Sequence, residues 1–154
     1  MKKIAEKRVA HFVKACRQNG VKATQQRREI LRELALTTEH PDAEKIYMRV
    51  RKRLPAISLN TVYRTLRIFE EQGDIFRVAT IRDRARFDAN TNCHHHFICS
   101  RCGRIDDFNS AALDRFKPPP EVAALGRVER IHIEFRGLCR QCRTRPGAVA
   151  GAPV

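Results

Sequence analysis

The chain of 154 residues contains no tryptophan and no apolar run long enough to cross a membrane. A membrane-spanning helix needs about 20 consecutive, mainly apolar residues. The charged N-terminal segment, residues 1–8, is not followed by the apolar stretch of a signal peptide. We therefore expect a cytoplasmic protein with no membrane partner.

Acidic residues are also scarce, because 17 Asp and Glu stand against 31 Lys and Arg and leave a net charge of +14. This excess favours an acidic partner, with nucleic acid as the first candidate and an anionic membrane surface as the second. Residues 1–90 carry +10 of the charge and residues 91–154 carry +4. The nucleic-acid surface is therefore expected in the first half, although a basic surface that only keeps the chain soluble is the alternative.

Apolar residues recur at helical spacing in four segments of the first half. The expected helices are one containing Ile4 to Cys16 and ended by Asn19-Gly20, one capped by Thr24, one opened by Pro41-Asp42, and residues 59–72, capped by Ser58 and ended by Gly73. Residues 74–80 and 84–89 read as two strands around the turn 81–83. This order predicts a winged helix-turn-helix, whose last helix enters the major groove of double-stranded DNA.

The outward face of residues 59–72 carries hydroxyl, aromatic and guanidinium groups that reach base edges and phosphates. These DNA-binding candidates are Asn60, Thr61, Tyr63, Arg64 and Arg67. Further phosphate contacts are expected from Lys14, Arg17, Arg27 and Arg28, and from Arg82, Arg84 and Arg86 in the hairpin. The alternative is that this is an ordinary solvated helix face.

Two Cys-x-x-Cys pairs dominate the second half. Cys99 and Cys102 form the first pair, and Cys139 and Cys142 form the second, 37 residues later. Two such pairs in a reducing compartment predict a closed tetrahedral zinc site with a structural role, because protein thiolates fill all four positions. Redox use of the cysteines is the competing interpretation.

The three histidines that precede the first cysteine pair fall on alternate faces of a short strand. His94 and His96 share one face, and Cys93, His95 and Phe97 take the other. Two imidazoles on one face make an incomplete metal site. Candidate partners are Asp88, Asp107 and His40, each of which could equally be a helix cap or a surface residue.

The remaining segments predict an α+β fold with two domains. A short helix is expected over residues 109–117, cut off by prolines 118–120, then a turn at 121–125 and a strand over 127–136. We predict a winged-helix DNA-binding domain over residues 1–89, with a hinge at about 84–92. A small α/β dimerisation and metal-binding domain over 93–143 and a disordered tail over 144–154 follow.

Five motifs, in this order and near this spacing, resemble the ferric uptake regulator family over roughly residues 10–142. They are His40-Pro-Asp-Ala-Glu-Lys-Ile-Tyr47, Ser58-Leu-Asn-Thr-Val-Tyr-Arg-Thr-Leu66, Arg86-Phe-Asp88, His94-His-His96-Phe-Ile-Cys99-x-x-Cys102-Gly and Gly137-Leu-Cys139-x-x-Cys142. The resemblance implies a homodimeric, metal-dependent transcriptional repressor that binds operator DNA, with structural zinc on the four cysteines.

The resemblance also implies a regulatory metal site at His40, Asp88, His94, His96 and Asp107. Two aspartates, where the iron-uptake branch usually has glutamates, resemble the peroxide-sensing branch of the family. In that branch the site takes Fe(II) or Mn(II), and peroxide reacting at iron oxidises a ligand histidine, here His40 or His94. Mixed nitrogen and oxygen donors suit both metals.

Two rivals remain. One is an iron- or zinc-uptake repressor of the same family, and the other, more remote, is a small non-haem metalloenzyme. Against an enzyme, the sequence offers no separate acid–base group, and the basic helix face would have no use. The family often has a further metal site around its His-rich strand; Cys93 and His95 stand in its expected region here, and Asp114 and His132 are looser candidates. Cys93 is read either as a packed strand residue or as an accessory redox thiol.

Overall fold

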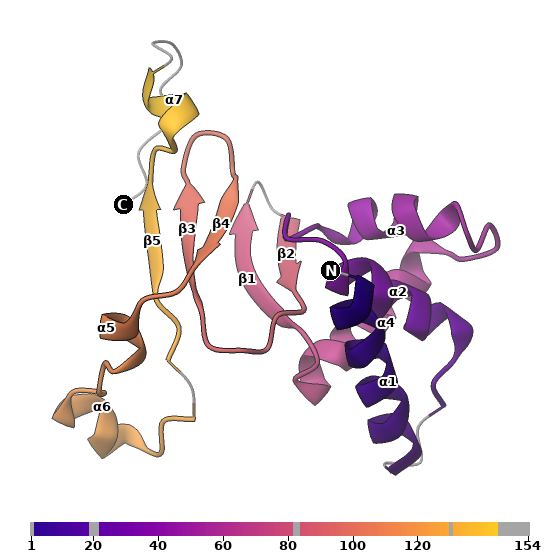
Figure 1. The fold of residues 1–154 in the computed structure, drawn as a ribbon, viewed down its shortest axis with the longest axis horizontal. Helices are drawn as coiled ribbons and strands as arrows, with labels where there is room; N and C mark the ends of the chain where they lie inside the picture. The colour runs from indigo at the N-terminus through magenta and orange to yellow at the C-terminus, as the bar shows by residue number, and fades with distance from the viewer. Residues whose placement is uncertain (1, 19–21, 82–83, 130, 145–154) are drawn as a thin grey trace. The chain divides into compact units, whose positions relative to one another are not determined.

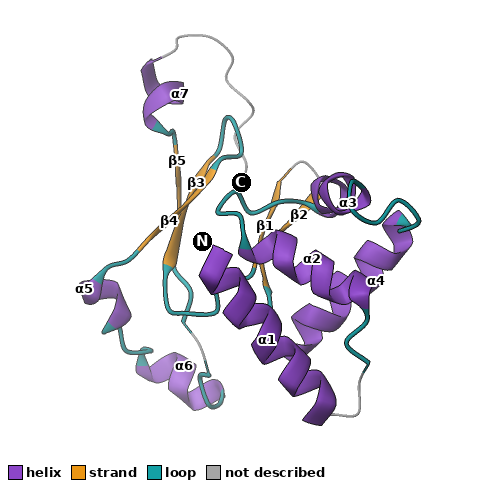
Figure 2. Cartoon of the chain, turned by 45° about the vertical axis from the view of Figure 1, so that its right-hand side comes forward, coloured by secondary structure: helices purple, strands orange, loops and turns teal. Residues whose placement is uncertain are grey.

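The computed structural model describes residues 2–18, 22–81, 84–129 and 131–144 of the chain. It separates into two compact units, residues 1–91 and residues 92–154. Helices dominate the first unit and a small sheet dominates the second, as Figures 1 and 2 show. The predicted α+β fold is confirmed, with a winged helix-turn-helix followed by a small α/β unit that carries the cluster of four cysteines.

The first unit contains four helices and a two-stranded antiparallel hairpin. They are α1 (Lys2–Gln18), α2 (Gln25–Ala35), α3 (Ala43–Arg51), α4 (Leu59–Gln72), β1 (Phe76–Ile81) and β2 (Arg84–Asp88). Side chains of Thr24, Asp42 and Ser58 accept backbone N–H bonds and cap the N-termini of α2, α3 and α4. Gly73 ends α4 with φ = 74°, a left-handed conformation that costs glycine little. These local signals were read correctly from the sequence.

The core of the first unit lies between the four helices and the hairpin. Phe12 of α1 and Phe69 of α4 meet edge to face, with ring centroids 5.0 Å apart, and both are buried. Ile30, Ile46 and Val62 add one fully buried side chain each from α2, α3 and α4. Because this core fixes the inward face of α4, the polar face of the same helix stays in solvent.

The second unit is built on a three-stranded sheet in the order β4-β3-β5. Strand β3 (His95–Cys99) pairs antiparallel with β4 (Ile105–Phe108) and parallel with β5 (Glu134–Gly137). Helices α5 (Ala111–Asp114) and α6 (Pro120–Leu125) lie toward one end of this sheet, and α7 (Arg140–Thr144) follows β5 at the other end (Figure 1).

Several predicted boundaries in the second unit are wrong. The strand expected over 127–136 begins only at Glu134, where the register with β3 starts opposite His96, and the Ile133 carbonyl before it accepts the His96 N–H. The helix expected over 109–117 is the single turn α5, and Pro120 starts α6 at the helix position that proline favours. Strand β4 and helix α7 were not predicted. Thr144 belongs to α7, and the rest of the expected tail lies outside the described residues.

The second unit buries little apolar surface within its described residues. Its buried apolar side chains are Ile98, Cys99, Ile105 and Cys139. Its large exposed ones are Phe116, Val122, Leu125, Val128, Phe135 and Leu138. Exposed apolar side chains are candidates for an interaction surface where they lie side by side. No described helix is long and apolar enough to span a bilayer.

Candidate metal centres and nucleic-acid interface

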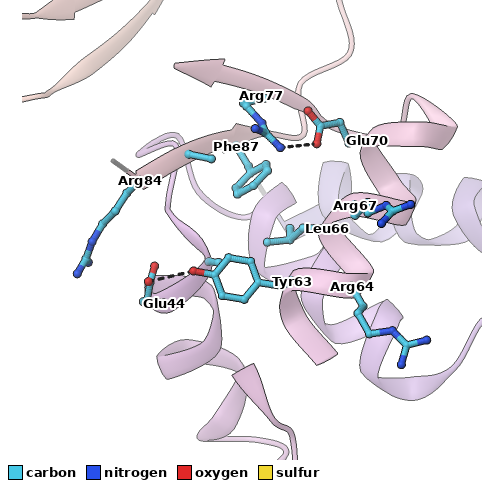
Figure 3. A pocket seen from close by; sticks show the side chains of 11 residues that line it. Glu44, Tyr63, Arg64, Leu66, Arg67, Glu70, Arg77, Arg84 and Phe87 are labelled. Atoms are coloured by element: carbon cyan, nitrogen blue, oxygen red, sulfur yellow. Dashed lines mark hydrogen bonds and ion pairs between the residues drawn. The ribbon is translucent and has the colours of Figure 1, made fainter. Parts of the chain in front are cut away.

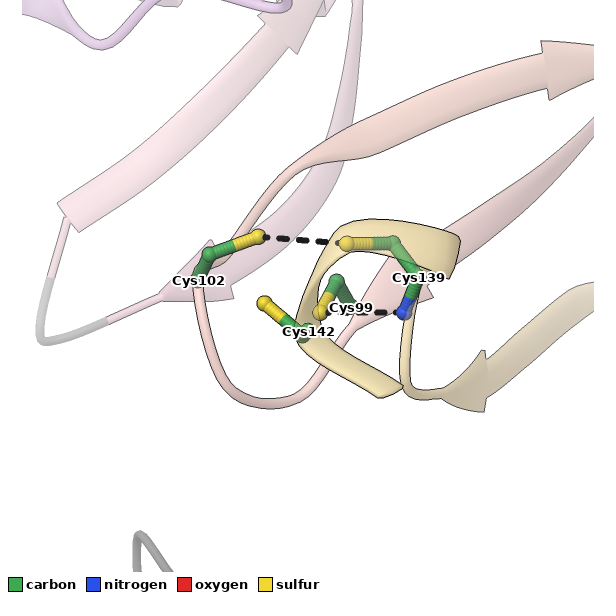
Figure 4. Close-up of side chains that lie close together, drawn as sticks. All are labelled: Cys99, Cys102, Cys139 and Cys142. Carbon is green, nitrogen blue, oxygen red and sulfur yellow. Dashed lines mark hydrogen bonds between the residues drawn. The ribbon is translucent and has the colours of Figure 1, made fainter. Parts of the chain in front are cut away.

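The four cysteines predicted to bind zinc lie together at one end of the sheet. One sulfur from each of Cys99, Cys102, Cys139 and Cys142 lies within 4.8 Å of every other. Cys102 Sγ and Cys139 Sγ are 3.9 Å apart, and the Cys139 backbone N–H donates to Cys99 Sγ at 3.4 Å. Figure 4 shows the four side chains converging from the β3–β4 turn and from α7.

The backbone explains why the two pairs meet. Cys99 and Gly137 are register partners on parallel strands, so each strand delivers one Cys-x-x-Cys turn to the same end of the sheet. Gly103 closes the first turn with φ = 73° and donates its N–H to the Cys99 carbonyl. A Cβ on Gly137 would lie 3.3 Å from the Phe97 ring, so glycine permits the close approach of β5 to β3.

The thiols differ in acidity. Burial raises the pKa of Cys99, but N–H groups of Cys102, Cys139 and Arg101 donate to its sulfur and lower the pKa to about 6. Burial and then hydrogen bonds from the neighbouring thiols raise the pKa of Cys142 to about 12. Four thiols this close cannot all ionise near neutral pH by themselves. A divalent cation supplies the charge that allows it, so the donor set fits zinc.

His94, His96 and Asp107 form a second group, within the second unit. His94 Nε2 and His96 Nε2 are 3.0 Å apart, which confirms that the two imidazoles share one face. Asp107 is the register partner of His96 across β3 and β4, and its Oδ1 lies 3.4 Å from His96 Nε2. Both histidines are buried, whereas Asp107 is exposed. Two imidazole nitrogens and a carboxylate oxygen therefore converge on one point.

Residues around this group orient it. His94 Nδ1 lies 2.8 Å from the Asn92 carbonyl, an arrangement that leaves Nε2 as the ligand atom. The His132 ring lies 5.0 Å from His96 and 5.8 Å from His94, centroid to centroid. Sequence spacing gave no sign of the Asn92 contact. The family resemblance had suggested His132 for a different site, together with Cys93 and His95.

His40 and Asp88 form a pair within the first unit. His40 Nε2 lies 3.8 Å from Asp88 Oδ2, and both residues are buried. Asp88 is the last residue of β2, and its Oδ1 accepts the Asn90 N–H at 2.7 Å. A buried imidazole beside a buried carboxylate offers one nitrogen and one oxygen donor to a cation.

Cys93, His95 and Asp114 form a third group, again in the second unit. Asp114 Oδ1 lies 3.1 Å from His95 Nε2 and 3.5 Å from Cys93 Sγ. His95 is buried, whereas the other two are exposed. Thiolate, imidazole and carboxylate are all metal ligands, but a hydrogen-bonded histidine of the sheet explains the same contacts.

Helix α4 presents the predicted DNA-binding residues. Asn60, Tyr63, Arg64 and Arg67 are exposed, and Thr61 is half-buried at the capped N-terminus. Tyr63 donates its hydroxyl hydrogen bond to Glu44 of α3 at 3.0 Å, a partner that sequence reasoning missed. Arg67 pairs with Glu71 at 2.8 Å on the helix surface, where such a pair contributes little stability and opens readily for a phosphate.

A hollow of about 440 Å³ lies between α4 and the hairpin. Four arginines line it, Arg64, Arg67, Arg77 and Arg84. Figure 3 shows Tyr63 turned toward Glu44 and Arg77 turned toward Glu70, each joined by a hydrogen bond. Guanidinium groups around a groove of this kind suit the phosphates of a nucleic-acid backbone.

The other predicted phosphate contacts have mixed outcomes. Lys14 and Arg28 are exposed, and Arg27 is half-buried with a bond to the Lys22 carbonyl. The side chain of Arg17 and the whole of Arg82 lie outside the described residues. Arg86 was wrongly expected to face DNA, because its guanidinium donates to the backbone carbonyls of Glu39 and His40.

Comparison with known proteins gives consistent results. The model of the ferric uptake regulator family matches residues 18–133. A peroxide-responsive repressor, PerR, of Staphylococcus epidermidis is 34% identical over 131 residues, which cover 85% of this chain and 87% of the relative. Residues 18–133, which the family model matches, include Cys99 and Cys102. Cys139 and Cys142 lie beyond this range, and the structure places them beside the first pair.

Solved structures share the fold. The peroxide stress regulator of Campylobacter jejuni superposes with a TM-score of 0.68 at 28% identity, covering 84% of this chain and 98% of that one. A zinc uptake regulator solved with zinc and DNA superposes with a TM-score of 0.62 at 25% identity, covering 90% and 95%. Because the family model matches well over half of the chain and the PerR relative is 34% identical over 85% of it, the chain belongs to the ferric uptake regulator family.

Proposed function

We propose that the chain is a cytoplasmic, metal-dependent repressor that senses hydrogen peroxide through oxidation of a ligand histidine. The observation that carries the proposal is the donor set on the two units. His40 and Asp88 lie in the unit with α4, and His94, His96 and Asp107 lie in the other. Three imidazoles and two carboxylates suit Fe(II) or Mn(II) better than a thiolate set would.

The two metal centres have different tasks in this proposal. Cys99, Cys102, Cys139 and Cys142 hold Zn(II) as a structural ion, since the thiolates leave no coordination position for a substrate. The five nitrogen and oxygen donors would hold the regulatory ion, at which peroxide reacts when the ion is iron. The buried state of His40, His94 and His96 supports this role, because it limits competition from water.

We favour a peroxide-sensing repressor over a metal-uptake repressor because of the two carboxylates. Asp88 and Asp107 have the short side chain that resembles the peroxide-sensing branch, and the matched relative is named as a peroxide-responsive repressor. Iron(II), when bound, supplies the reducing chemistry. The net reaction adds one oxygen atom from peroxide to an imidazole and releases water, and His40 or His94 is the acceptor.

DNA binding follows from the residues of the first unit. Helix α4 offers Asn60, Thr61, Tyr63, Arg64 and Arg67 to the major groove, and Lys14 and Arg17 of α1 offer phosphate contacts. A metal ion with ligands from both units would restrain the winged helix relative to the dimerisation unit. The two half-sites of an operator lie at a fixed spacing, so the two recognition helices of a dimer must lie at the matching separation. Metal and operator therefore strengthen each other's binding.

A homodimer is part of the proposal. The second unit has few buried apolar residues and exposes Phe116, Val122, Leu125 and Phe135. Strands β4 and β5 are the two edges of its sheet and keep backbone groups available for pairing. A second copy that covers these residues would bury the apolar surface that one copy leaves in solvent.

The test uses a duplex selected from a random pool with the Mn(II)-loaded chain. The anaerobic Fe(II) and Mn(II) forms are then treated with near-stoichiometric peroxide, and DNA binding and peptide mass are measured on the same samples. We expect only the Fe(II) form to release DNA and to gain one oxygen at His40 or His94. If both forms keep the DNA and the histidines stay intact, the chain is an iron- or zinc-uptake repressor.

A matched pair of variants tests the carboxylate argument. Asp107→Glu should weaken peroxide sensitivity and keep metal-dependent DNA binding. Asp106→Glu is the control, because Asp106 accepts a hydrogen bond from Arg104, the residue before β4, and is not part of the donor group. Equal peroxide sensitivity in both variants would count against the aspartates as the determinant.

A further inference from the structure

The backbone at His40 has an unusual conformation. His40 has φ = 48°, the left-handed region, and among the described residues no other non-glycine residue does so. Residues other than glycine disfavour this region because their Cβ comes too close to the following carbonyl oxygen. The next residue is Pro41, and a residue before proline prefers extended backbone. A conformation with two such disadvantages persists only when surrounding contacts impose it.

Arg86 of β2 supplies those contacts. Its Nε donates to the His40 carbonyl, and its Nη2 donates to the Glu39 carbonyl at 2.7 Å. The guanidinium is half-buried, and burial lowers the pKa of Arg86. A planar fork with several donors can hold two neighbouring carbonyls in one geometry, which a lysine ammonium cannot do as rigidly.

The neighbours of Arg86 extend the contact along the strand. The Phe87 N–H donates to the Pro41 carbonyl at 3.2 Å, and Arg84 lies 3.7 Å from the Asp42 carboxylate. Arg86 and Phe87 thus bond to backbone carbonyls of the loop that connects α2 to α3, whereas the exposed Arg84 contributes only a charge near Asp42, which a lysine would keep. The same strand ends in Asp88, whose carboxylate lies 3.8 Å from His40.

We propose that Arg86 is a positioning residue, which holds the His40 backbone in its left-handed conformation and so sets the His40 imidazole beside Asp88 for metal. The inference rests on the proposed function, because it takes His40 and Asp88 as ligands of the regulatory ion. It also joins that ligand pair to the hairpin of the winged helix. Arg86 therefore links the His40 backbone directly to the hairpin.

The test compares Arg86→Lys with Arg84→Lys, the same substitution two residues away on the same strand. Mn(II) affinity is measured by calorimetry on zinc-loaded protein without DNA, with His40→Ala as the reference for a lost ligand. We expect Arg86→Lys to raise the Mn(II) Kd roughly tenfold, because apparent affinity falls with the fraction of chains in the binding-competent backbone. Arg84→Lys should keep the original Kd, and both should keep zinc and helix content.

A second readout needs no regulatory metal. In the metal-free chain, the Phe87 amide should exchange with solvent faster in Arg86→Lys than in Arg84→Lys, since its acceptor is the Pro41 carbonyl. An unchanged Mn(II) Kd in Arg86→Lys, with a weakened Kd in His40→Ala, overturns the positioning role alone. An unchanged Kd in His40→Ala overturns the ligand assignment instead, and the Phe87 exchange rate then still shows whether Arg86 holds the loop.

Discussion

Removing one of the four cysteines proposed to bind zinc should unfold the second unit and leave the first unit folded. Cys102 is the position of choice, because its side chain is exposed and Cys102→Ser removes a ligand with little loss of packing. In the second unit, Ile98 and Ile105 are the buried branched side chains, each worth about 2–3 kcal/mol. A structural zinc contributes about 10–16 kcal/mol in small zinc domains. The metal therefore outweighs the apolar burial, and its loss should be decisive.

The assay is amide hydrogen exchange read by peptide mass spectrometry, with zinc measured on the same sample. Cys102→Ser should lose protection in β3, β4 and β5 and keep protection in α2, α3 and α4. Cys93→Ser is the control, since Cys93 is an exposed thiol of the same unit outside the four-cysteine group. It should keep both its zinc and its exchange pattern.

Two results would refute this reasoning. If zinc-free Cys102→Ser keeps full protection in β3, apolar packing or dimer contacts suffice to hold the sheet, and zinc is not its main support. If α2 to α4 lose protection together with the sheet, the core around Phe69 does not sustain the first unit by itself.

Three further predictions concern the first unit. Gly73→Ala should lower the free energy of unfolding by about 1–2 kcal/mol through backbone conformation alone, since no atom lies within 4 Å of the added Cβ, and Gly73→Asn by less; equal losses in urea unfolding would argue against this cause. Phe69→Ala should cost about 3–5 kcal/mol by the same measurement, and a loss below about 1 kcal/mol would mean that Phe12 repacks. Tyr63→Phe should weaken DNA binding roughly tenfold in a fluorescence titration, about the value of one charge-assisted hydrogen bond, with stability nearly unchanged. Unchanged DNA affinity would assign the Tyr63 hydroxyl to Glu44 alone.

The helix boundaries of the first unit could be predicted because their signals are local. A cap such as Ser58 bonds to an N–H three residues away, and Gly73 ends α4 through its own φ angle. The faces of β3 followed from alternation, which put His94 and His96 together. In each case the determinant lies within a few residues of the feature it controls.

The missed features depend on contacts between distant residues. Arg86 donates to the His40 carbonyl, 46 positions earlier in the chain. Sequence alone does not reveal this contact, so the charged side chain in the hairpin was interpreted as a phosphate contact. Strand β4 forms by pairing with β3, and of the strand predicted over 127–136 the part that pairs with β3 is Glu134–Gly137, which extends one residue further. Spacing in the sequence reports what a segment can form, whereas pairing decides what it does form.

The two metal centres differ in how their ligands are distributed over the fold, and this bears on their tasks. All four cysteines belong to the second unit, so an ion among them stabilises that unit without reference to the other. The five regulatory candidates are divided, with His40 and Asp88 on one unit and the remaining three on the other, so neither unit supplies a full set. A ligand can shift an equilibrium only by its difference in affinity for the two states. In the proposed function, ligands divided in this way would provide that difference, because one ion could engage the full set only by drawing on both units. Replacing a cysteine of the four-cysteine cluster should therefore unfold the second unit. Replacing His40 should abolish the regulation of DNA binding and leave both units folded.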